Sequence, residues 1–265
     1  MSSPSMDTPD RTAPEAGLRE QLETLARRNA ELEQANQDLE WSLFVASHDL
    51  QECLRTVITY AQFLAKRYGD RLDGEEAMFV NNVIGGAGRM RDLLSDLLAY
   101  SAVGANPRRL PETVNLNTVM EIVKENLKAS IEETRAIITS TPLPVLKARA
   151  SDFIPLFQNL VANAIKYRSQ RRPEVHVAMH RTDGQLWFAI SDNGIGIASE
   201  HHEEIFDPFM RLHGRDIPGT GIGLAICRRI VQRYSGRIWV ESRLGAGATF
   251  RFTLPEAAVL PTDSV

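Results

Sequence analysis

The sequence contains only two cysteines among its 265 residues, Cys53 and Cys227. Two isolated cysteines form neither a disulfide framework nor a metal-binding motif, which favours a reducing, cytoplasmic compartment. No stretch is apolar for long enough to span a bilayer. Residues 1–17 also lack the apolar core of a signal peptide, and their Ser, Pro, Thr and Asp content predicts a disordered tail. We therefore expect a cytoplasmic protein without a membrane span in this chain.

The sequence also lacks a large excess of charge of either sign. Thirty Lys and Arg residues stand against 34 Asp and Glu residues, which gives a formal net charge of -4. This balance excludes a general polyanion-binding surface as the main function, and we expect no nucleic-acid partner. The hydrophobic share of 43% and the charged share of 24% are typical of a soluble globular protein of one or two domains.

Two series of residues recur every seven positions between residues 18 and 43. The first is Leu18, Leu25, Leu32 and Leu39, and the second is Leu22, Asn29, Asn36 and Leu43. Such a heptad repeat is typical of a coiled coil, and asparagine on its seam favours an in-register parallel dimer. The alternative is a single amphipathic helix that lies on a domain. We predict a coiled-coil signalling helix over residues 18–43 that joins two copies of the chain.

The same heptad register continues into residues 44–103, which we read as a helical hairpin. It places six residues on an inner seam: Ala46, Leu50, Cys53, Val57, Tyr60 and Leu64. His48 then lies on the outer face. The stretch from Tyr68 to Gly74 has the glycines and aspartates of a turn, and a second amphipathic run begins near Asp73-Gly74. Because two helices alone form a thin core, we expect the hairpin to dimerise into a four-helix bundle.

Residues 104–257 alternate between helical and strand patterns and predict an α+β sandwich with a mixed sheet. A linker is expected at residues 104–107, helices at 115–133, 152–168 and 221–235, and strands at 175–179, 186–190, 237–242 and 249–254. Asp183-Gly184 is a hairpin turn signal. Ten of the 17 glycines lie between Gly184 and Gly247, where the backbone must bend or approach a ligand. Residues 258–265 are read as a tail.

Three clusters in this second domain point to chemistry. On a helix, Asn159, Asn163 and Lys166 fall on one face, which suits a hydrated magnesium ion and phosphate oxygens. A solvated polar face is the alternative. Asp192-Asn193-Gly194-Ile195-Gly196 follows a strand pattern and can hold a nucleobase, although it is also ordinary turn chemistry. Gly219-Thr220-Gly221-Ile222-Gly223 opens a helix, where backbone N–H groups bind phosphate.

Together with His48, these clusters resemble the sensor histidine kinases of two-component systems. The residues that follow His48 and those around Gly219 are most similar to the phytochrome-like subgroup. Five motifs occur in the family's order over about residues 42–255. They are an H box at Ser47–Leu54, an N box at Asn159–Tyr167, a G1 box at Asp192–Gly196, an F box at Phe206–Phe209 and a G2 box at Gly219–Leu224.

The resemblance implies an ATP-dependent protein-histidine kinase. His48 would accept the γ-phosphoryl group and Asp49 would orient its imidazole or take its proton. Asn163 would bind Mg²⁺, and Asp192 would accept a hydrogen bond from the adenine amino group. Residues between about 198 and 219 would form a mobile lid. The implied nucleotide-binding set is Asn159, Asn163, Lys166, Tyr167, Asp192, Gly194, Gly196, Ile197, Gly219, Thr220, Gly221, Gly223 and Leu224.

The implied partners are a second copy of the chain, a separate response regulator that receives the phosphoryl group on an aspartate, and an upstream sensor domain or partner protein. Two positions depart from the family pattern. Cys53 stands where the family often has proline, and it is either an apolar core residue or a redox-sensitive group. Glu52 stands where related kinases that also dephosphorylate their partner usually carry Thr or Asn. Two other functions stay open: a non-catalytic dimeric scaffold with a degenerate nucleotide domain, and another ATPase of the same fold.

Overall fold

The computed structural model describes residues 12–69, 73–103, 112–212, 217 and 219–256. Their contacts divide the chain into two compact units, with the boundary after Ala46. None of the described helices combines the length and the apolar character that crossing a membrane requires. The predicted linker at residues 104–107 and the predicted tail at 258–265 lie outside the described residues.

The first unit consists of the N-terminal part of helix α1 (Thr12–Tyr68), a helix of 57 residues that continues into the second unit. It begins inside the predicted disordered tail, so that prediction is wrong for residues 12–17. A proline in the first turn of a helix sacrifices no intrahelical hydrogen bond, and Pro14 is therefore compatible with this start. The heptad leucines Leu22, Leu25, Leu32 and Leu39 are all exposed, with 57–71% of their surface accessible.

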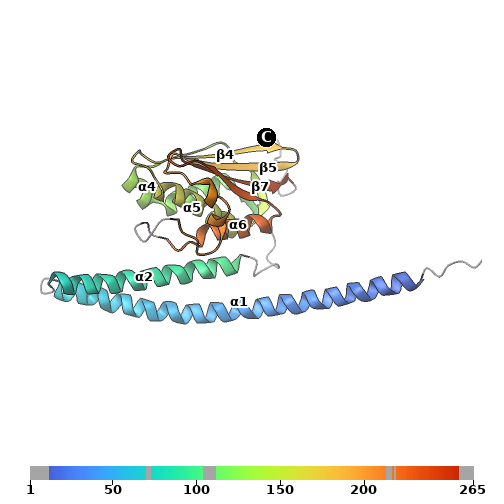
Figure 1. Ribbon diagram of the computed structural model, residues 1–265, viewed down its shortest axis with the longest axis horizontal. Helices are drawn as coiled ribbons and strands as arrows, with labels where there is room; N and C mark the ends of the chain where they lie inside the picture. Colours follow the sequence, from blue (N-terminus) through green and yellow to red (C-terminus); the bar gives the residue numbers. More distant parts are fainter. Residues whose placement is uncertain (1–11, 70–72, 104–111, 213–216, 218, 257–265) are drawn as a thin grey trace, which may run out of the picture. The chain divides into compact units, whose positions relative to one another are not determined.

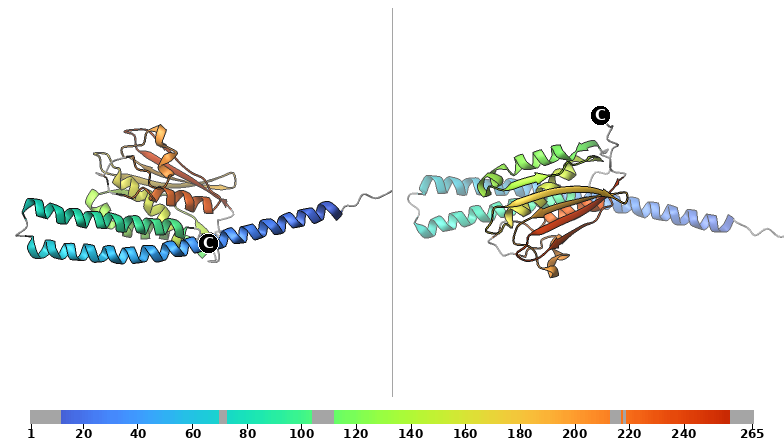
Figure 2. Two further views of the ribbon diagram at one scale, coloured as in Figure 1. Left: turned by 60° about the horizontal axis from the view of Figure 1, so that its bottom comes forward. Right: turned by 90° about the horizontal axis from the view of Figure 1, so that it is seen from above.

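In the second unit, the rest of α1 and helix α2 (Gly74–Ala102) form the predicted antiparallel hairpin. Figures 1 and 2 show these helix segments side by side. Asp73 starts α2 with a capping box: its carboxylate accepts hydrogen bonds from Glu75 N and Glu76 N, and Glu76 caps the Asp73 backbone in return. This reciprocal pair fixes the point at which the chain re-enters a helix.

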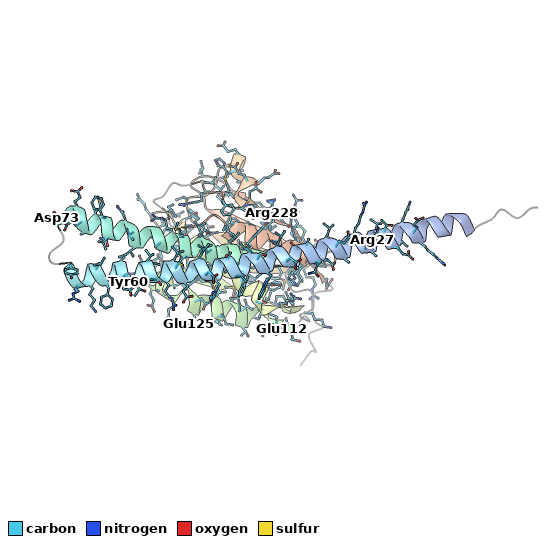
Figure 3. All side chains as sticks on the ribbon, turned by 90° about the horizontal axis from the view of Figure 1, so that it is seen from below. Arg27, Tyr60, Asp73, Glu112, Glu125 and Arg228 are labelled. Carbon is cyan, nitrogen blue, oxygen red and sulfur yellow. The ribbon has the colours of Figure 1, made fainter. Side chains whose placement is uncertain are left out.

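Within one chain the hairpin buries a stripe next to the predicted seam. Ser47 and Ala61 are buried on α1, and Ala87 is buried on α2. The seam residues Leu50, Cys53, Val57, Tyr60 and Leu64 are exposed. Figure 3 labels Tyr60 among the side chains along α1. A large apolar stripe on α1 thus has no partner within the described part of the chain.

All the described strands belong to the α+β domain. A five-stranded sheet has the order β2-β4-β5-β7-β6, and a small antiparallel pair is formed by β1 and β3. The strands are β1 (Glu112–Asn115), β2 (Ile137–Ser140), β3 (Val145–Ala148), β4 (Glu174–Thr182), β5 (Gln185–Asp192), β6 (Ile238–Ser242) and β7 (Ala248–Pro255). Only the β2–β4 pair of the larger sheet is parallel, which confirms the predicted mixed sheet.

Helices cover one face of this sheet, as Figure 1 shows. They are α3 (Leu116–Asn126), α4 (Lys128–Thr134), α5 (Ala150–Lys166) and α6 (Gly223–Arg233), with short 3-10 turns η1 (Ser199–His201) and η2 (Glu204–Phe206). The core between the layers contains Phe157, Phe188 and Phe252. The rings of Phe188 and Phe252 stack at 4.6 Å, and Phe157 contacts both edge-on. The two-layer architecture confirms the predicted α+β sandwich.

The local predictions differ from the structure mainly at breaks and short strands. The helix expected at 115–133 is two helices that meet at Leu127. The helices expected at 152–168 and 221–235 are confirmed as α5 and α6. Asp183 and Gly184 have φ angles of 52° and 70°, which confirms the predicted hairpin turn. Strands β1, β2 and β3 were not expected, because four residues are too few to show a period.

Candidate functional site

Helix α5 is amphipathic and orients the first polar cluster. Leu156, Leu160 and Ile165 are buried in the core. Asn159 and Asn163 are half-buried on the other side of the helix. Because apolar side chains hold one face of the helix against the sheet, the carboxamides are presented on a rigid surface.

The end of α5 is joined to the loop that follows β5. Ile195 N donates a hydrogen bond of 3.0 Å to the carbonyl oxygen of Tyr167, the residue that caps α5. A Cβ at Gly194 would overlap this same oxygen. A Cβ at Gly196, which has a φ of 71°, would overlap the carbonyl of Arg243. These two glycines are required because neighbouring backbone occupies the space of a side chain.

Asp192 lies at the end of β5, where this loop begins. Its Oδ1 accepts hydrogen bonds from Gly194 N at 2.8 Å and from Ala248 N at 3.2 Å. Burial raises the pKa of the Asp192 carboxyl above its ordinary value, and the two backbone donors oppose that shift. Because two backbone N–H groups hold Oδ1, the carboxylate has a fixed orientation at the wall of the pocket described below.

The glycine-rich loop before α6 lies against the polar face of α5. A Cβ at Gly219 would lie 2.5 Å from Lys166 Nζ, and a Cβ at Gly223 would lie 2.9 Å from Asn159 Oδ1. The loop is therefore close enough to both side chains to share one ligand with them. The N–H groups at the start of the 11-residue α6 face the same region, where an anion is favoured.

The segment after β5 is connected to this loop through the backbone. Phe209 N donates to Gly221 O at 3.0 Å, and a Cβ at Gly221 would lie 2.7 Å from the Phe209 carbonyl carbon. Phe206 is buried and meets Phe250 edge-on at 6.3 Å. Phe209 is instead 59% exposed and has a φ of 67°. Of the two aromatic residues of the segment Phe206–Phe209, one anchors the segment in the core and the other faces solvent.

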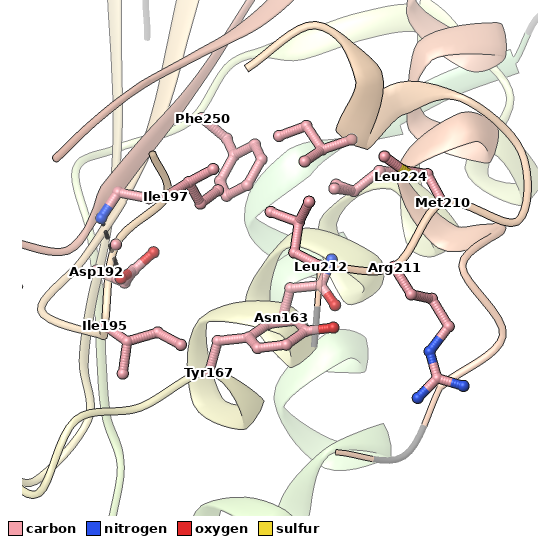
Figure 4. Close-up of a pocket in the computed structure, with 13 residues that line it drawn as sticks. Asn163, Tyr167, Asp192, Ile195, Ile197, Met210, Arg211, Leu212, Leu224 and Phe250 are labelled. Carbon is pink, nitrogen blue, oxygen red and sulfur yellow. Dashed lines mark hydrogen bonds between the residues drawn. The ribbon is translucent and has the colours of Figure 1, made fainter. Parts of the chain in front are cut away.

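These elements enclose a pocket, shown in Figure 4. It is lined by Asn163, Tyr167, Asp192, Ile195, Gly196, Ile197, Ile205, Met210, Arg211, Leu212, Leu224, Ala248 and Phe250. Six of these were predicted from sequence: Asn163, Tyr167, Asp192, Gly196, Ile197 and Leu224. The other predicted positions, Asn159, Lys166, Gly194, Gly219, Thr220, Gly221 and Gly223, border it through the contacts described above or continue its glycine-rich loop.

The structure adds an apolar wall and a cation that sequence reasoning missed. Met210 and Leu212 come from the segment after Phe209, and Phe250 comes from β7. Arg211 follows two residues after the segment Phe206–Phe209, and its Nη2 donates to Ile217 O at 2.9 Å. A lone arginine in a loop carries little signal in a sequence, but here its guanidinium lies at the pocket edge (Figure 4).

His48 and Asp49 are not part of this pocket. His48 is exposed on α1, and its Nδ1 lies 3.4 Å from Asp49 Oδ1. His48 lines a separate groove on the hairpin together with Gln51, Glu52, Arg55, Ile58, Thr59, Arg91, Asp92 and Ser95. The two halves of the predicted site are therefore distinct surfaces of the second unit.

The donor set at the pocket suits one kind of metal ion. Among the described residues, no group of three or more His, Cys, Asp or Glu side chains is placed to hold a metal. Asn163 offers a carboxamide oxygen in the pocket, and Asn159 offers a second one beside Gly223. Mg²⁺ commonly takes one or two protein oxygens and completes its shell with phosphate and water. The residues present fit that ion better than a metal that needs a full protein cage.

Comparisons with known proteins agree with this geometry. Residues 149–258 match the family described as histidine kinase-, DNA gyrase B-, and HSP90-like ATPase. The chain is 44% identical over 236 residues to cyanobacterial phytochrome A of Nostoc sp. strain PCC 7120 and 39% identical over 236 residues to the phytochrome-like protein Cph1 of Synechocystis sp. strain PCC 6803. Each alignment covers 89% of this chain and 31% of the relative, so the chain spans about a third of these proteins.

Two solved structures superpose on most of this chain. ShkA in complex with AMPPNP superposes with a TM-score of 0.64 at 25% identity, over 83% of this chain and 46% of that one. The kinase ThkA in complex with the response regulator TrrA has a TM-score of 0.56 at 22% identity, over 86% of this chain and 66% of that one. At that identity the second likeness shows the fold alone.

Proposed function

Because the chain belongs to the sensor histidine kinase family, we propose that it transfers the γ-phosphoryl group of ATP to His48 and from there to an aspartate of a separate response regulator. The observation that carries the proposal is the combination of two sites in one chain. One is the pocket that joins Asn163, Tyr167 and Asp192 to the glycine-rich loop. The other is an exposed histidine with a carboxylate beside it.

In this proposal the adenine enters the pocket and its amino group donates a hydrogen bond to Asp192. The apolar wall of Met210, Leu212 and Phe250 excludes water from the ring. The triphosphate extends toward Gly219–Gly223, where Lys166 and the N–H groups of α6 neutralise its charge. Mg²⁺, held by Asn163 with Asn159 beside it, supplies charge neutralisation to the phosphate oxygens when it is bound.

The position of Asp49 indicates which imidazole nitrogen of His48 is the nucleophile. Asp49 Oδ1 faces Nδ1, so Nδ1 carries the proton and Nε2 keeps its lone pair. Nε2 bonds to the γ-phosphorus while the bond to the bridging β–γ oxygen breaks, and ADP leaves with that electron pair. The Nδ1 proton then passes to Asp49 or to water, which leaves an uncharged imidazole ring that carries the anionic phosphoryl group. Because positioning dominates phosphoryl transfer, no further catalytic group is required.

Dimerisation is supported by the two exposed apolar stripes on α1. The heptad leucines Leu22, Leu25, Leu32 and Leu39 are exposed in the first unit. In the second unit the exposed seam residues include Leu50, Val57, Tyr60 and Leu64. Large contiguous apolar surfaces of this kind mark protein–protein contacts. We propose that a second copy covers both, as a coiled coil over residues 18–43 and as a four-helix bundle over 44–103, with residues 104–257 as the catalytic domain.

The proposal is tested with γ-labelled ATP. The purified chain is expected to incorporate acid-labile, base-stable phosphate and then to pass it to a receiver domain, while His48→Gln incorporates none. Equal incorporation by His48→Gln would contradict the assignment. Sustained ATP hydrolysis without a phosphoprotein would favour another ATPase of this fold, and absent ATP binding would favour a scaffold.

A further inference from the structure

Helix α2 of the hairpin contacts the glycine-rich loop directly. Thr220 Oγ1 donates a hydrogen bond of 2.5 Å to Asp96 Oδ2, and both residues are half-buried there. Four residues later on α2, one helical turn away, the Tyr100 ring carries the Arg229 guanidinium of α6 at 4.7 Å from its centroid. Leu93 and Leu97 of the same helix pack against the core of the α+β domain. This face of α2 is thus docked onto α6 and the loop that precedes it.

The hydroxyl of Thr220 cannot donate to a phosphate oxygen while it donates to Asp96. A threonine hydroxyl has one proton to donate, and here Asp96 accepts it. The same Thr220 oxygen accepts from Ile222 N at 3.3 Å, so the hydroxyl is oriented from both sides. A phosphate oxygen at this loop offers only acceptors, and it cannot replace Asp96 unless the carboxylate leaves.

The charges around the loop also set Asp96 and a phosphate group in competition. Gly219 and Gly221, which flank Thr220, have φ angles of 153° and 80°, and Lys166 Nζ lies close to Gly219. The loop is therefore arranged for an anion, and in this structure the anion beside it is the side chain of Asp96. Two anions that share one set of donors destabilise each other, because their like charges repel.

We propose that Asp96 is an autoinhibitory latch that competes with the triphosphate of ATP for Thr220. This inference rests on the proposed function, since it concerns regulation of the same nucleotide site. When Asp96 holds Thr220, the α+β domain is docked on α2 and cannot travel to His48. When a triphosphate occupies the loop, the latch opens and that domain is released. By linkage, each event weakens the other by the same factor.

The test measures affinity for AMPPNP with magnesium on the full chain by calorimetry. Asp96→Ala removes the charge and the acceptor, and Asp96→Asn removes the charge alone. Both variants are expected to bind AMPPNP more tightly, Asp96→Ala by about fivefold or more. The matched control is Asp183→Asn, the same loss of charge at the exposed β4–β5 turn, where asparagine tolerates the positive φ of 52°. Its affinity is expected to equal that of the wild type.

A second readout follows the latch itself. Hydrogen exchange of the peptide that contains Leu93 to Tyr100 is expected to quicken when AMPPNP is added to the wild type. In Asp96→Ala that exchange is expected to be fast without nucleotide. Wild-type binding of AMPPNP with no gain of affinity in Asp96→Ala would overturn the latch alone. Failure of the wild type to bind AMPPNP would overturn the proposed function as well.

Discussion

The carbonyl oxygen of Tyr167 occupies the space that a Cβ on Gly194 would fill. This oxygen ends α5 and accepts the hydrogen bond of Ile195 N, so it cannot move without loss of that bond. The contact brings the residues after β5 against the helix that carries Asn159 and Asn163. The nucleotide pocket therefore depends on an absent side chain as much as on the polar groups that line it.

Gly194→Ala is expected to distort this junction. The added methyl group meets backbone, and overpacking of this kind costs on the order of 1–3 kcal/mol. We expect a lower thermal midpoint and a loss of ATP affinity of at least about tenfold. Gly88→Ala in α2 is the matched control, because a Cβ there meets nothing within 4 Å. An unchanged ATP affinity in Gly194→Ala would show that the junction does not shape the pocket.

Asp192→Asn is expected to weaken ATP binding by about 10- to 100-fold, the value of a hydrogen bond to a charged group. The two backbone N–H groups that now face Oδ1 would hold the amide oxygen. The amide NH₂ would then face the adenine amino group, donor against donor. Calorimetry with ATP and with GTP measures the effect, and the variant should lose its preference for adenine. Retained discrimination would place the base elsewhere.

Acid is expected to weaken ATP binding at a pH above the one at which an ordinary aspartate titrates. Burial raises the pKa of Asp192 above 3.8, so this carboxylate takes up its proton earlier as the pH falls. The protonated group accepts poorly from the adenine amino hydrogen. Binding should therefore be full above the raised pKa and decline below it. Asp192→Asn provides the baseline for titration of ATP itself, and equal pH profiles of the two proteins would contradict this role.

Val57→Glu is expected to convert dimers into monomers without unfolding the chain. Val57 is 45% exposed in the hairpin, so the protomer tolerates a charge, whereas a bundle would bury two of them at its centre. Sedimentation analysis measures the shift. Gln62→Glu, an exposed position on the same helix, serves as the control and should remain dimeric. A Val57→Glu chain with the wild-type mass in solution would exclude this stripe as the interface.

Much of this architecture could be predicted from periodicity and short motifs. The heptad leucines and the amphipathic face of α5 are local patterns, so they identify helices and their apolar sides. The break at Leu127 could not be predicted, because both halves of the pattern are amphipathic and the break depends on packing. The start of α1 at Thr12 was missed because a compositional bias toward Ser and Pro outweighed the helix-forming residues that follow.

The candidate site also contains both residues that short motifs identify and residues that only tertiary contacts bring there. Asp192 and the glycines stand in short motifs, whereas Phe250 reaches the pocket only because β7 pairs with β5. Asp96 carries no motif, and its contact with Thr220 joins residues 124 positions apart. Residues that act through tertiary contact leave no local pattern, and such residues complete the pocket and its latch.

We propose that His48 accepts the phosphoryl group of ATP on Nε2, and this step has a distinct chemical product. The most direct measurement is phosphopeptide mapping at neutral to alkaline pH after incubation with magnesium and ATP, combined with phosphorus NMR of the intact chain. We expect one phosphopeptide that contains His48, with the chemical shift of Nε2-phosphohistidine. A phosphoryl group on another residue, or no phosphopeptide from a chain that binds ATP, would contradict it.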